Sequence, residues 1–488
     1  MGKPNVLFLL SDDQSYFAQH RECPEILTPN LDALAEQGSY FSRCFCASPV
    51  CSPARASILT GTMPSNHGIH DWLIDGSVDP EKLPPFSRSR PPIRDNETQA
   101  IDFLEGITTY TDILAQEGYD IALSGKWHLG DTMKPRKGYT YWNSILRGGC
   151  RYTAYDLYRD GQVTAHTDYL TDRIADNAID FLRNYRSDKP FYLGVHFTAP
   201  HTPWDREEHP QEIWDLYEGV NFDTIPWAPV HKNQMVNSFI GDTPEKRRKQ
   251  IRGYFTAVTA MDTAIGRILE ALRQLGLEED TIVVFTSDNG MNVGQHGVWG
   301  KGNGTYPQNF YEESIRVPLI LRVPEKHQQT VTDMVSHVDL FPTILELCGI
   351  QAQSDRPCGA SFAAVLDGQP FQREFVAVCS EYGAVRMLRN QRYKLVKNYI
   401  NGDDLFYDLQ ADPGETVNRI ADPAYLQIRE EMALQMDAAF ARYADPQKDG
   451  RFQFPKGMGQ TQKCTPETGT QAYKQAFAMY YEQSPQPH

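Results

Sequence analysis

Apolar and polar residues follow two alternating patterns along most of the chain. Short runs dominated by apolar side chains, typical of strands buried on both faces of a sheet, lie at residues 5–10, 121–126, 191–197 and 281–286. Between them, apolar residues recur at helical spacing at residues 29–38, 112–119, 169–185, 245–275 and 338–347. This alternation predicts an α/β fold, with a large, mixed and mostly parallel sheet sandwiched by helices.

The pattern changes toward the carboxyl end of the chain. After a break in composition at residues 350–373, short β-prone runs lie at 376–379, 384–388, 393–396 and 405–409, and a helix is predicted at 424–443. We therefore expect a large N-terminal domain at residues 1–373. A C-terminal subdomain at 374–488 should contain a small antiparallel sheet, a helix and a tail.

Two long segments show neither pattern. Residues 76–98 are rich in proline, serine and charge, and are predicted to run over the surface. Residues 205–245 contain tryptophan, proline and histidine, and are long enough to form a lid or a substrate loop.

Composition limits the partners of the protein. With 40% hydrophobic and 23% charged residues the chain is an ordinary globular protein. Its net charge of −16 argues against binding nucleic acid or an anionic membrane, so an anionic substrate must be attracted locally. No run approaches the ~18 apolar residues of a membrane span. We expect a soluble protein, periplasmic or secreted if a signal peptide has been removed and cytoplasmic otherwise.

One stretch combines a cysteine with the start of a helix. Ser52 is predicted to be the N-cap and Pro53 to lie in the first turn, which places Cys51 just outside the helix. Arg55 lies one turn further on, so its guanidinium and the first backbone N–H groups can face the same anion as the cysteine. The alternative is a buried, inert cysteine before a helix.

Oxygen-bearing side chains follow two of the predicted strands. Asp12 and Asp13 follow the run at 5–10, and Asp288 and Asn289 follow the run at 281–286. If the two strands are neighbours, these four residues form the set of oxygen ligands that a hard cation takes. Taken alone, each pair also fits a solvated turn.

Three further segments carry candidates for proton transfer or anion binding. Lys126 and His128, two residues apart at a strand end, can point toward one ligand. His201 is held between two prolines, and Lys301 lies in a glycine-rich loop at 295–304 that permits close approach of a ligand. Lys126 and His128 could instead be ordinary surface residues, and His201 could simply belong to a tight turn. The loop with Lys301 could be a flexible loop without a ligand.

Together these residues resemble a known family. Cys51-x-Pro53-x-Arg55, with Leu-Thr-Gly at 59–61 and Gly-Lys-Trp-His-Leu-Gly at 125–130, is similar to the signature of the type I, formylglycine-dependent sulfatases of the alkaline phosphatase superfamily. The likeness spans roughly residues 4–443. It implies an alkaline phosphatase-like sheet. It also implies that a formylglycine-generating or anaerobic sulfatase-maturing enzyme oxidises Cys51 to formylglycine.

The resemblance also assigns roles to residues. Asp12, Asp13, Asp288 and Asn289 would hold a divalent cation, normally Ca²⁺ rather than Mg²⁺ or Mn²⁺. Arg55, Lys126 and Lys301 would neutralise charge on the transferring group. His201, alone or with Lys301, would protonate the leaving alcohol, and His128 would take the proton that releases sulfate. The acid and base roles can be exchanged without contradicting the sequence.

The predicted function is hydrolysis of a sulfate monoester, on a carbohydrate. Aromatic and polar residues near the predicted pocket are candidates for substrate contact: His70, Asp71, Trp72, Trp204 and His296. Two alternatives remain at this point. One is a phosphonate monoester or phosphodiester hydrolase of the same superfamily, and the other is a non-catalytic, metal-stabilised protein that binds an anion or a sugar with Cys51 unmodified.

Overall fold

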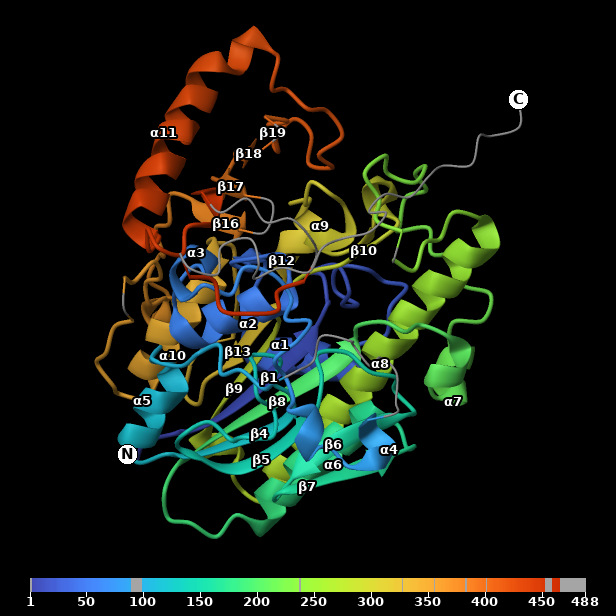
Figure 1. The fold of residues 1–488 in the computed structure, drawn as a ribbon, viewed down its shortest axis with the longest axis vertical. Coiled ribbons are helices and arrows are strands. Elements are labelled where there is room, and N and C mark those ends of the chain that lie inside the picture. Colours follow the sequence, from blue (N-terminus) through green and yellow to red (C-terminus); the bar gives the residue numbers. More distant parts are fainter. Residues whose placement is uncertain are drawn as a thin grey trace.

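A ten-stranded sheet forms the centre of the structure (Figure 1). The computed structural model describes residues 2–88, 99–236, 238–326, 328–354, 356–381, 384–400, 402–452 and 459–465. The sheet order is β14-β2-β13-β9-β1-β8-β4-β5-β6-β7. The five central strands are parallel: β9 (Thr281–Ser287), β1 (Asn5–Asp12), β8 (Phe191–Pro200), β4 (Asp120–Lys126) and β5 (Tyr139–Ile145). The α/β fold with a mostly parallel sheet is therefore confirmed.

Shorter strands, most of them antiparallel to a neighbour, complete both edges of the sheet. A hairpin of β6 (Tyr155–Arg159) and β7 (Gln162–His166) extends one edge, and it was not predicted. Its turn contains Asp160 and Gly161, both with positive φ, which is the Asp-Gly signal typical of a tight hairpin. The other edge consists of β13 (Leu319–Arg322), β2 (Ser39–Phe41) and β14 (Gln329–Val331).

Helices cover both faces of the sheet. Along β1, Val6, Phe8 and Leu10 belong to one apolar core, whereas Leu7 and Leu9 belong to the other. This alternation follows from the period of two in a strand. One face is covered by α1 (Pro29–Gln37), α6 (Leu170–Asn184) and α8 (Pro244–Gln274), and the other by α2 (Cys51–Thr60), α5 (Tyr110–Gln116) and α10 (Leu340–Leu347).

A second, four-stranded antiparallel sheet follows the catalytic region, as predicted. It is formed by β16 (Val376–Ser380), β17 (Val385–Arg389), β18 (Tyr393–Asn398) and β19 (Leu405–Asp408). Helix α11 (Leu426–Tyr443) packs on this sheet through Met432, Met436 and Phe440, at the top of Figure 1. The boundary at residues 373 and 374 remains a prediction.

The remaining elements are short. They are β3 (Cys44–Phe45), α3 (Pro64–His67), α4 (Pro85–Arg88), α7 (Gln211–Asp215), β10 (Asn292–Val293), β11 (Trp299–Gly300), α9 (Glu312–Ile315), β12 (Arg316–Val317) and β15 (Val335–Ser336). The described part of the region 205–245 thus contains a 3-10 helix at Arg206–Glu208, the short helix α7 and the start of α8. Of the predicted surface segment 76–98, residues 89–98 lie outside the described residues. Among the described helices, none is both long and apolar enough to cross a membrane.

The start of α2 differs from the prediction. Val50 is the N-cap and Cys51 is the first helical residue, because the Ala54 N–H already donates to the Val50 carbonyl at 3.1 Å. Ser52 is therefore inside the helix, and its hydroxyl accepts a hydrogen bond from the distant Leu73 N–H at 3.1 Å. The prediction that Ser52 caps the helix and leaves Cys51 outside it was wrong.

Candidate active site

Two neighbouring strands bring the predicted oxygen ligands together. β1 and β9 are adjacent and parallel, with Ser11 opposite Ser287, so their carboxyl ends lie at the same edge. The Asp13 N–H donates to Oδ1 of Asp288 at 3.2 Å, and Nδ2 of Asn289 donates to Oδ1 of Asp13 at 2.8 Å. The structure therefore supplies the adjacency that the sequence could not show.

This cluster fits a hard cation. Ligand oxygens of Asp12, Asp13 and Asp288 all lie within 4.8 Å of one another, and all three residues are buried. Among the described residues, Oδ1 of Asp12 and Oδ1 of Asn289 have no hydrogen-bond partner. Buried oxygens of this kind are normally satisfied, and a cation with oxygen ligands would satisfy them.

The pKa values of the clustered carboxylates also favour a bound cation. Burial, together with the neighbouring Asp12 carboxylate, raises the pKa of Asp288 to about 7. Burial also favours the neutral acid at Asp12, but the facing cations, Lys126 first, hold the pKa of that carboxyl well below its usual range. Without a cation Asp288 therefore keeps a proton more readily than an ordinary aspartate does, and a divalent cation at these oxygens would favour its charged form.

Three cationic side chains surround the carboxylates. Nε of Arg55 donates to Oδ2 of Asp288 at 2.8 Å, and Nζ of Lys301 lies 2.7 Å from Oδ1 of Asp13. Nζ of Lys126, fully buried, contacts Oδ2 of Asp12. The three predicted anion-binding residues are thus brought to one cluster, and each is oriented by a different carboxylate.

Cys51 lies beside this cluster at the start of α2. Its side chain is buried, and its Sγ lies 3.5 Å from Nδ1 of His128. Burial raises the pKa of the Cys51 thiol, although Lys301 and Lys126 oppose the shift. Residue 51 therefore carries a protonated thiol, which is a poor nucleophile.

The contacts of His128 define its tautomer. Its Nε2 lies 2.8 Å from the Leu73 carbonyl oxygen, which can only accept a hydrogen bond, so Nε2 carries the proton. Nδ1 is then an acceptor that faces residue 51. Burial also lowers the pKa of His128 well below its usual value. The ring is therefore neutral and oriented as a base toward residue 51.

Two of these residues have unusual backbone conformations. Asp13 and His128 have φ of 68° and 57°, in the left-handed region that side chains other than glycine rarely adopt. Such strain persists where the surroundings hold it and is concentrated at functional sites.

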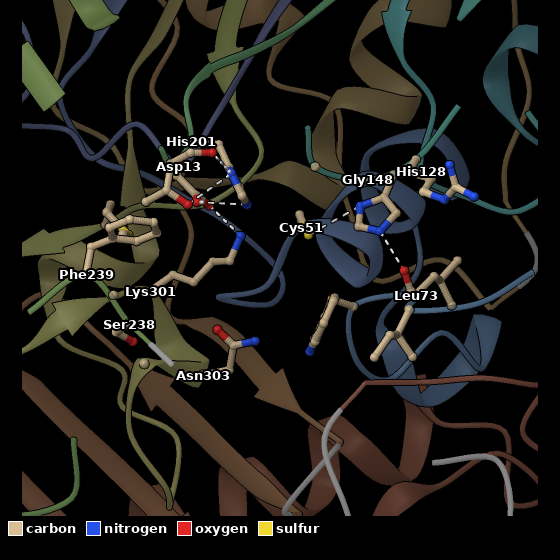
Figure 2. A pocket seen from close by; sticks show the side chains of 18 of the residues that line it. Asp13, Cys51, Leu73, His128, Gly148, His201, Ser238, Phe239, Lys301 and Asn303 are labelled. Atoms are coloured by element: carbon tan, nitrogen blue, oxygen red, sulfur yellow. Dashed lines mark hydrogen bonds and ion pairs between the residues drawn. The ribbon is translucent and has the colours of Figure 1, made fainter. Parts of the chain in front are cut away.

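A cavity connects the residues with solvent (Figure 2). Asp13, Cys51, His128, His201 and Lys301 all line it. His201 and Lys301 lie on one side, near Asp13, and His128 lies on the opposite side of Cys51 (Figure 2). Nε2 of His201 is 3.8 Å from Oδ2 of Asp13. A group bound over residue 51 would therefore have proton-transfer side chains on two sides.

The five candidates for substrate contact divide between the cavity and its surroundings. Trp72 and Trp204 line the cavity. His70 and Asp71 are 0% and 1% exposed and lie behind its lining, where the Gly459 N–H donates to Oδ2 of Asp71 at 2.8 Å. His296 pairs with Glu313 at 3.0 Å, away from the described lining of this cavity.

Several lining residues were not predicted from the sequence. They include Leu73, Arg147, Gly148, Gly149, Ser238, Phe239 and Asn303. The paired glycines at 148 and 149 are a signal of close approach that could have been used, because a Cβ at Gly148 would stand 2.1 Å from Nε2 of His128. The Leu73 carbonyl carries no sequence signal, since any residue supplies that group.

Comparisons with known proteins agree with this geometry. A family model described as "Sulfatase" matches residues 4–350, and one described as "N-sulphoglucosamine sulphohydrolase, C-terminal" matches residues 294–442. An N-acetylglucosamine-6-O-sulfatase of Bacteroides thetaiotaomicron is 27% identical, over 92% of this chain and 88% of its own length. A choline-sulfatase of Rhizobium meliloti is 27% identical, over 86% of this chain and 83% of its own.

Solved structures show the same fold. One described as a complex with its substrate D-glucosamine-2-N,6-O-disulfate superposes with a TM-score of 0.75 at 24% identity. The match covers 92% of this chain and 99% of the other.

Proposed function

This chain belongs to the sulfatase family, and on that premise we propose that it hydrolyses a carbohydrate sulfate monoester through a formylglycine made from Cys51. The observation that carries the proposal is the position of residue 51. Its Sγ lies 3.5 Å from a histidine held as a base, beside a cluster of carboxylates and cations suited to an anion with a metal.

Modification of Cys51 explains why a cysteine stands at this position. A buried, protonated thiol attacks poorly, and an adduct formed by sulfur would have no simple route of release. An aldehyde hydrate at residue 51 would present two hydroxyl groups, one for attack and one for release. The modification requires a formylglycine-generating or anaerobic sulfatase-maturing enzyme as a partner.

In the first step, one hydroxyl of the hydrate loses its proton to solvent and its oxygen attacks the sulfur of the ester. The new O–S bond forms as the bond between sulfur and the alcohol oxygen breaks, and the alcohol leaves with a proton from Lys301 or from the protonated form of His201. Burial lowers the pKa of His201, so this histidine can donate only after it has taken up a proton. Arg55, Lys126 and Lys301 stabilise the charge on the sulfuryl oxygens. The product is a sulfate ester on residue 51.

In the second step, His128 takes the proton of the remaining hydroxyl through Nδ1. The C–O bond to the sulfate breaks, sulfate leaves, and the aldehyde forms again. Addition of water restores the hydrate, so one water is consumed for each ester cleaved. The tautomer set by the Leu73 carbonyl suits this role, because it leaves Nδ1 free of hydrogen.

The residues that would hold the cation are Asp12, Asp13, Asp288 and Asn289, with Ca²⁺ preferred over Mg²⁺ or Mn²⁺ for this all-oxygen set. When bound, the cation would polarise the sulfate oxygens and favour the deprotonated nucleophile.

A carbohydrate is the substrate class that the cavity suits. Trp72 and Phe239 offer apolar surfaces for a sugar ring, and Asn303 and Arg147 offer polar groups for its hydroxyls. Trp204 is only 1% exposed and can support this surface from behind. The N-acetylglucosamine-6-O-sulfatase similarity supports the same class, whereas the choline-sulfatase similarity shows that the fold also serves other alcohols.

Three measurements test the proposal. Protein made in a host able to modify it should give a peptide around residue 51 that has lost its sulfur by mass spectrometry. The enzyme should release sulfate from an aryl sulfate faster than it cleaves an aryl phosphodiester, and a panel of sulfated mono- and disaccharides should identify its substrate. Faster diester cleavage would instead support a phosphodiester hydrolase. Retention of the sulfur in an active enzyme would exclude the formylglycine mechanism.

A further inference from the structure

A segment near the carboxyl end packs against the lining of the cavity. Residues 459–465 follow the elements of the C-terminal subdomain and lie outside the residues that the family models match. Gln460 pairs with the strand-like segment 72–74, donating its N–H to the Trp72 carbonyl at 2.8 Å and accepting from the Ile74 N–H at 3.0 Å. Trp72, Leu73 and Ile74 all line the cavity.

The side chain of Gln460 is fully buried and bonded through both ends of its amide. Its Oε1 accepts from the His70 N–H at 2.8 Å, and its Nε2 donates to the Gly68 carbonyl at 3.0 Å. Nε2 also donates to the Gln462 carbonyl at 2.9 Å. Oε1 also accepts from the Asp71 N–H at 3.4 Å, so Gln460 binds the backbone of residues 68–74 at five places.

Residues 68–74 include the hydrogen-bond partner of His128. Leu73 lies between the two residues that Gln460 bonds, and its N–H is held from the other side by Oγ of Ser52, next to Cys51. Its carbonyl, in turn, accepts from Nε2 of His128 at 2.8 Å. The orientation of His128 therefore depends on where the Leu73 carbonyl stands, and Gln460 bonds the residues on both sides of Leu73.

We propose that Gln460 is a positioning residue for His128, acting through Leu73 to keep Nδ1 of the imidazole directed at residue 51. This proposal takes the catalytic role of His128 from the proposed function, but the orientation of the His128 ring can be tested separately. Loss of the amide would leave buried backbone groups of residues 68 and 70 without their partner, so the segment would shift to satisfy them. The Leu73 carbonyl would move with it.

The tautomer of His128 gives the first test, and it needs no substrate. In protein labelled with ¹⁵N-histidine, two-bond ¹H–¹⁵N spectra should show His128 protonated at Nε2, with the signal identified by its loss in His128→Ala. Gln460→Ala should shift this signal or mix the two tautomers. Gln462→Ala is the matched control, because its exposed side chain is removed while its backbone carbonyl is kept. An unchanged His128 pattern in Gln460→Ala would overturn the proposal.

Kinetics give the second test. Because His128 acts after the ester bond has broken, Gln460→Ala should lower kcat by about 10-fold or more and lower KM in proportion, leaving kcat/KM within about threefold of wild type. In a His128→Ala background the same substitution should add less than about a threefold loss of kcat, because the two residues act as one unit. A parallel fall in kcat/KM, or losses that multiply in the double variant, would mean general damage and overturn the proposal.

A folding defect is distinguished by a second variant. Gln460→Asn keeps the amide and shortens it, so the same spectra and kinetics apply if thermal unfolding shows that Gln460→Ala does not fold. Wild-type protein with the expected His128 tautomer but no sulfate release would refute the proposed function alone. The positioning of His128 by Gln460 would then still be decided by the spectra.

Discussion

Gly148 lies directly against the imidazole of His128: a Cβ atom on Gly148 would stand 2.1 Å from Nε2, far inside contact distance. Gly148→Ala should therefore displace the ring from the Leu73 carbonyl and lower kcat by about 10²-fold, within the range for loss of a general base. Steady-state kinetics with an aryl sulfate measure this. At Gly149 the nearest atom to such a Cβ is Cε1 of His201 at 3.4 Å, which is an ordinary contact. Gly149→Ala should therefore lower kcat much less than Gly148→Ala does. Equal losses in the two variants would contradict the assignment.

His201 and His128 should respond differently to the leaving group. If His201 protonates the departing alcohol, His201→Ala should lower turnover of a sugar or alkyl sulfate by about 10²- to 10⁴-fold. Turnover of a nitrophenyl sulfate by the same variant should fall by less than about 10-fold, because this leaving group needs little protonation. His128→Ala should affect kcat for both substrates alike, since it acts after the alcohol has left. The reverse pattern would exchange the two roles.

Removal of divalent cations should destabilise the fold as well as abolish activity. A cation held by Asp12, Asp13 and Asp288 binds only the folded chain, because the unfolded chain does not bring these carboxylates together, so a chelator should lower the melting temperature and added Ca²⁺ should restore it. Asn289→Ala should raise the Ca²⁺ concentration for half-restoration by at least about 10-fold, through loss of one ligand.

A second group of side chains provides the control for the cation site. His296, Glu313 and Glu415 also lie close enough together to hold a metal. Glu313→Gln should leave the Ca²⁺ response unchanged if the cation binds at the ends of β1 and β9. If Ca²⁺ restored the melting temperature of Glu313→Gln less well but that of Asn289→Ala normally, the cation would bind at His296, Glu313 and Glu415 instead.

Asp71 should make stability depend on pH. Burial raises the pKa of Asp71 from 3.8 to about 7, so the folded protein keeps a proton that the unfolded chain releases. The resulting stabilisation is complete below 3.8 and is lost as the pH rises through about 7. Asp71→Asn keeps an acceptor for the Gly459 N–H. As the pH rises, its free energy of unfolding should increase relative to that of wild type, by up to about 4 kcal/mol.

Thermal or denaturant unfolding between about pH 5 and about pH 8 measures this difference. Asp188→Asn, at an exposed carboxylate, is the control and should show no such trend. A constant difference between wild type and Asp71→Asn across the range would show that the residue is charged in the folded protein.

The sequence predicted those parts of the fold that depend on local patterns. The runs at 5–10 and 281–286 became β1 and β9, because an apolar run ending in polar residues reports a buried strand directly. That these strands are neighbours depends on the order of the whole sheet, which no local pattern encodes. The cation cluster was therefore predicted as a set of ligands and became a site only in the structure.

The site was less predictable where its contacts use backbone groups. Leu73 acts through its carbonyl, and Gln460 bonds main-chain atoms about 390 positions away, so neither leaves a characteristic residue pattern. His70 and Asp71 show the converse problem. Their polar side chains suggested substrate contact, but the C-terminal segment covers them. Burial by a distant segment cannot be inferred from the spacing of nearby residues.

The pairing of residues 72–74 with Gln460 also sets an order of events during synthesis. A ribosome makes the whole ten-stranded sheet, the second sheet and α11 before it reaches residue 460. Until then the segment that carries Leu73 lacks its bonds to Gln460, and the bond from the Leu73 N–H to Ser52 must hold it alone. On the proposed mechanism, an enzyme that modifies Cys51 can act during the time taken to translate those residues. On the same mechanism, His128 takes its final orientation only when the segment with Gln460 has been made.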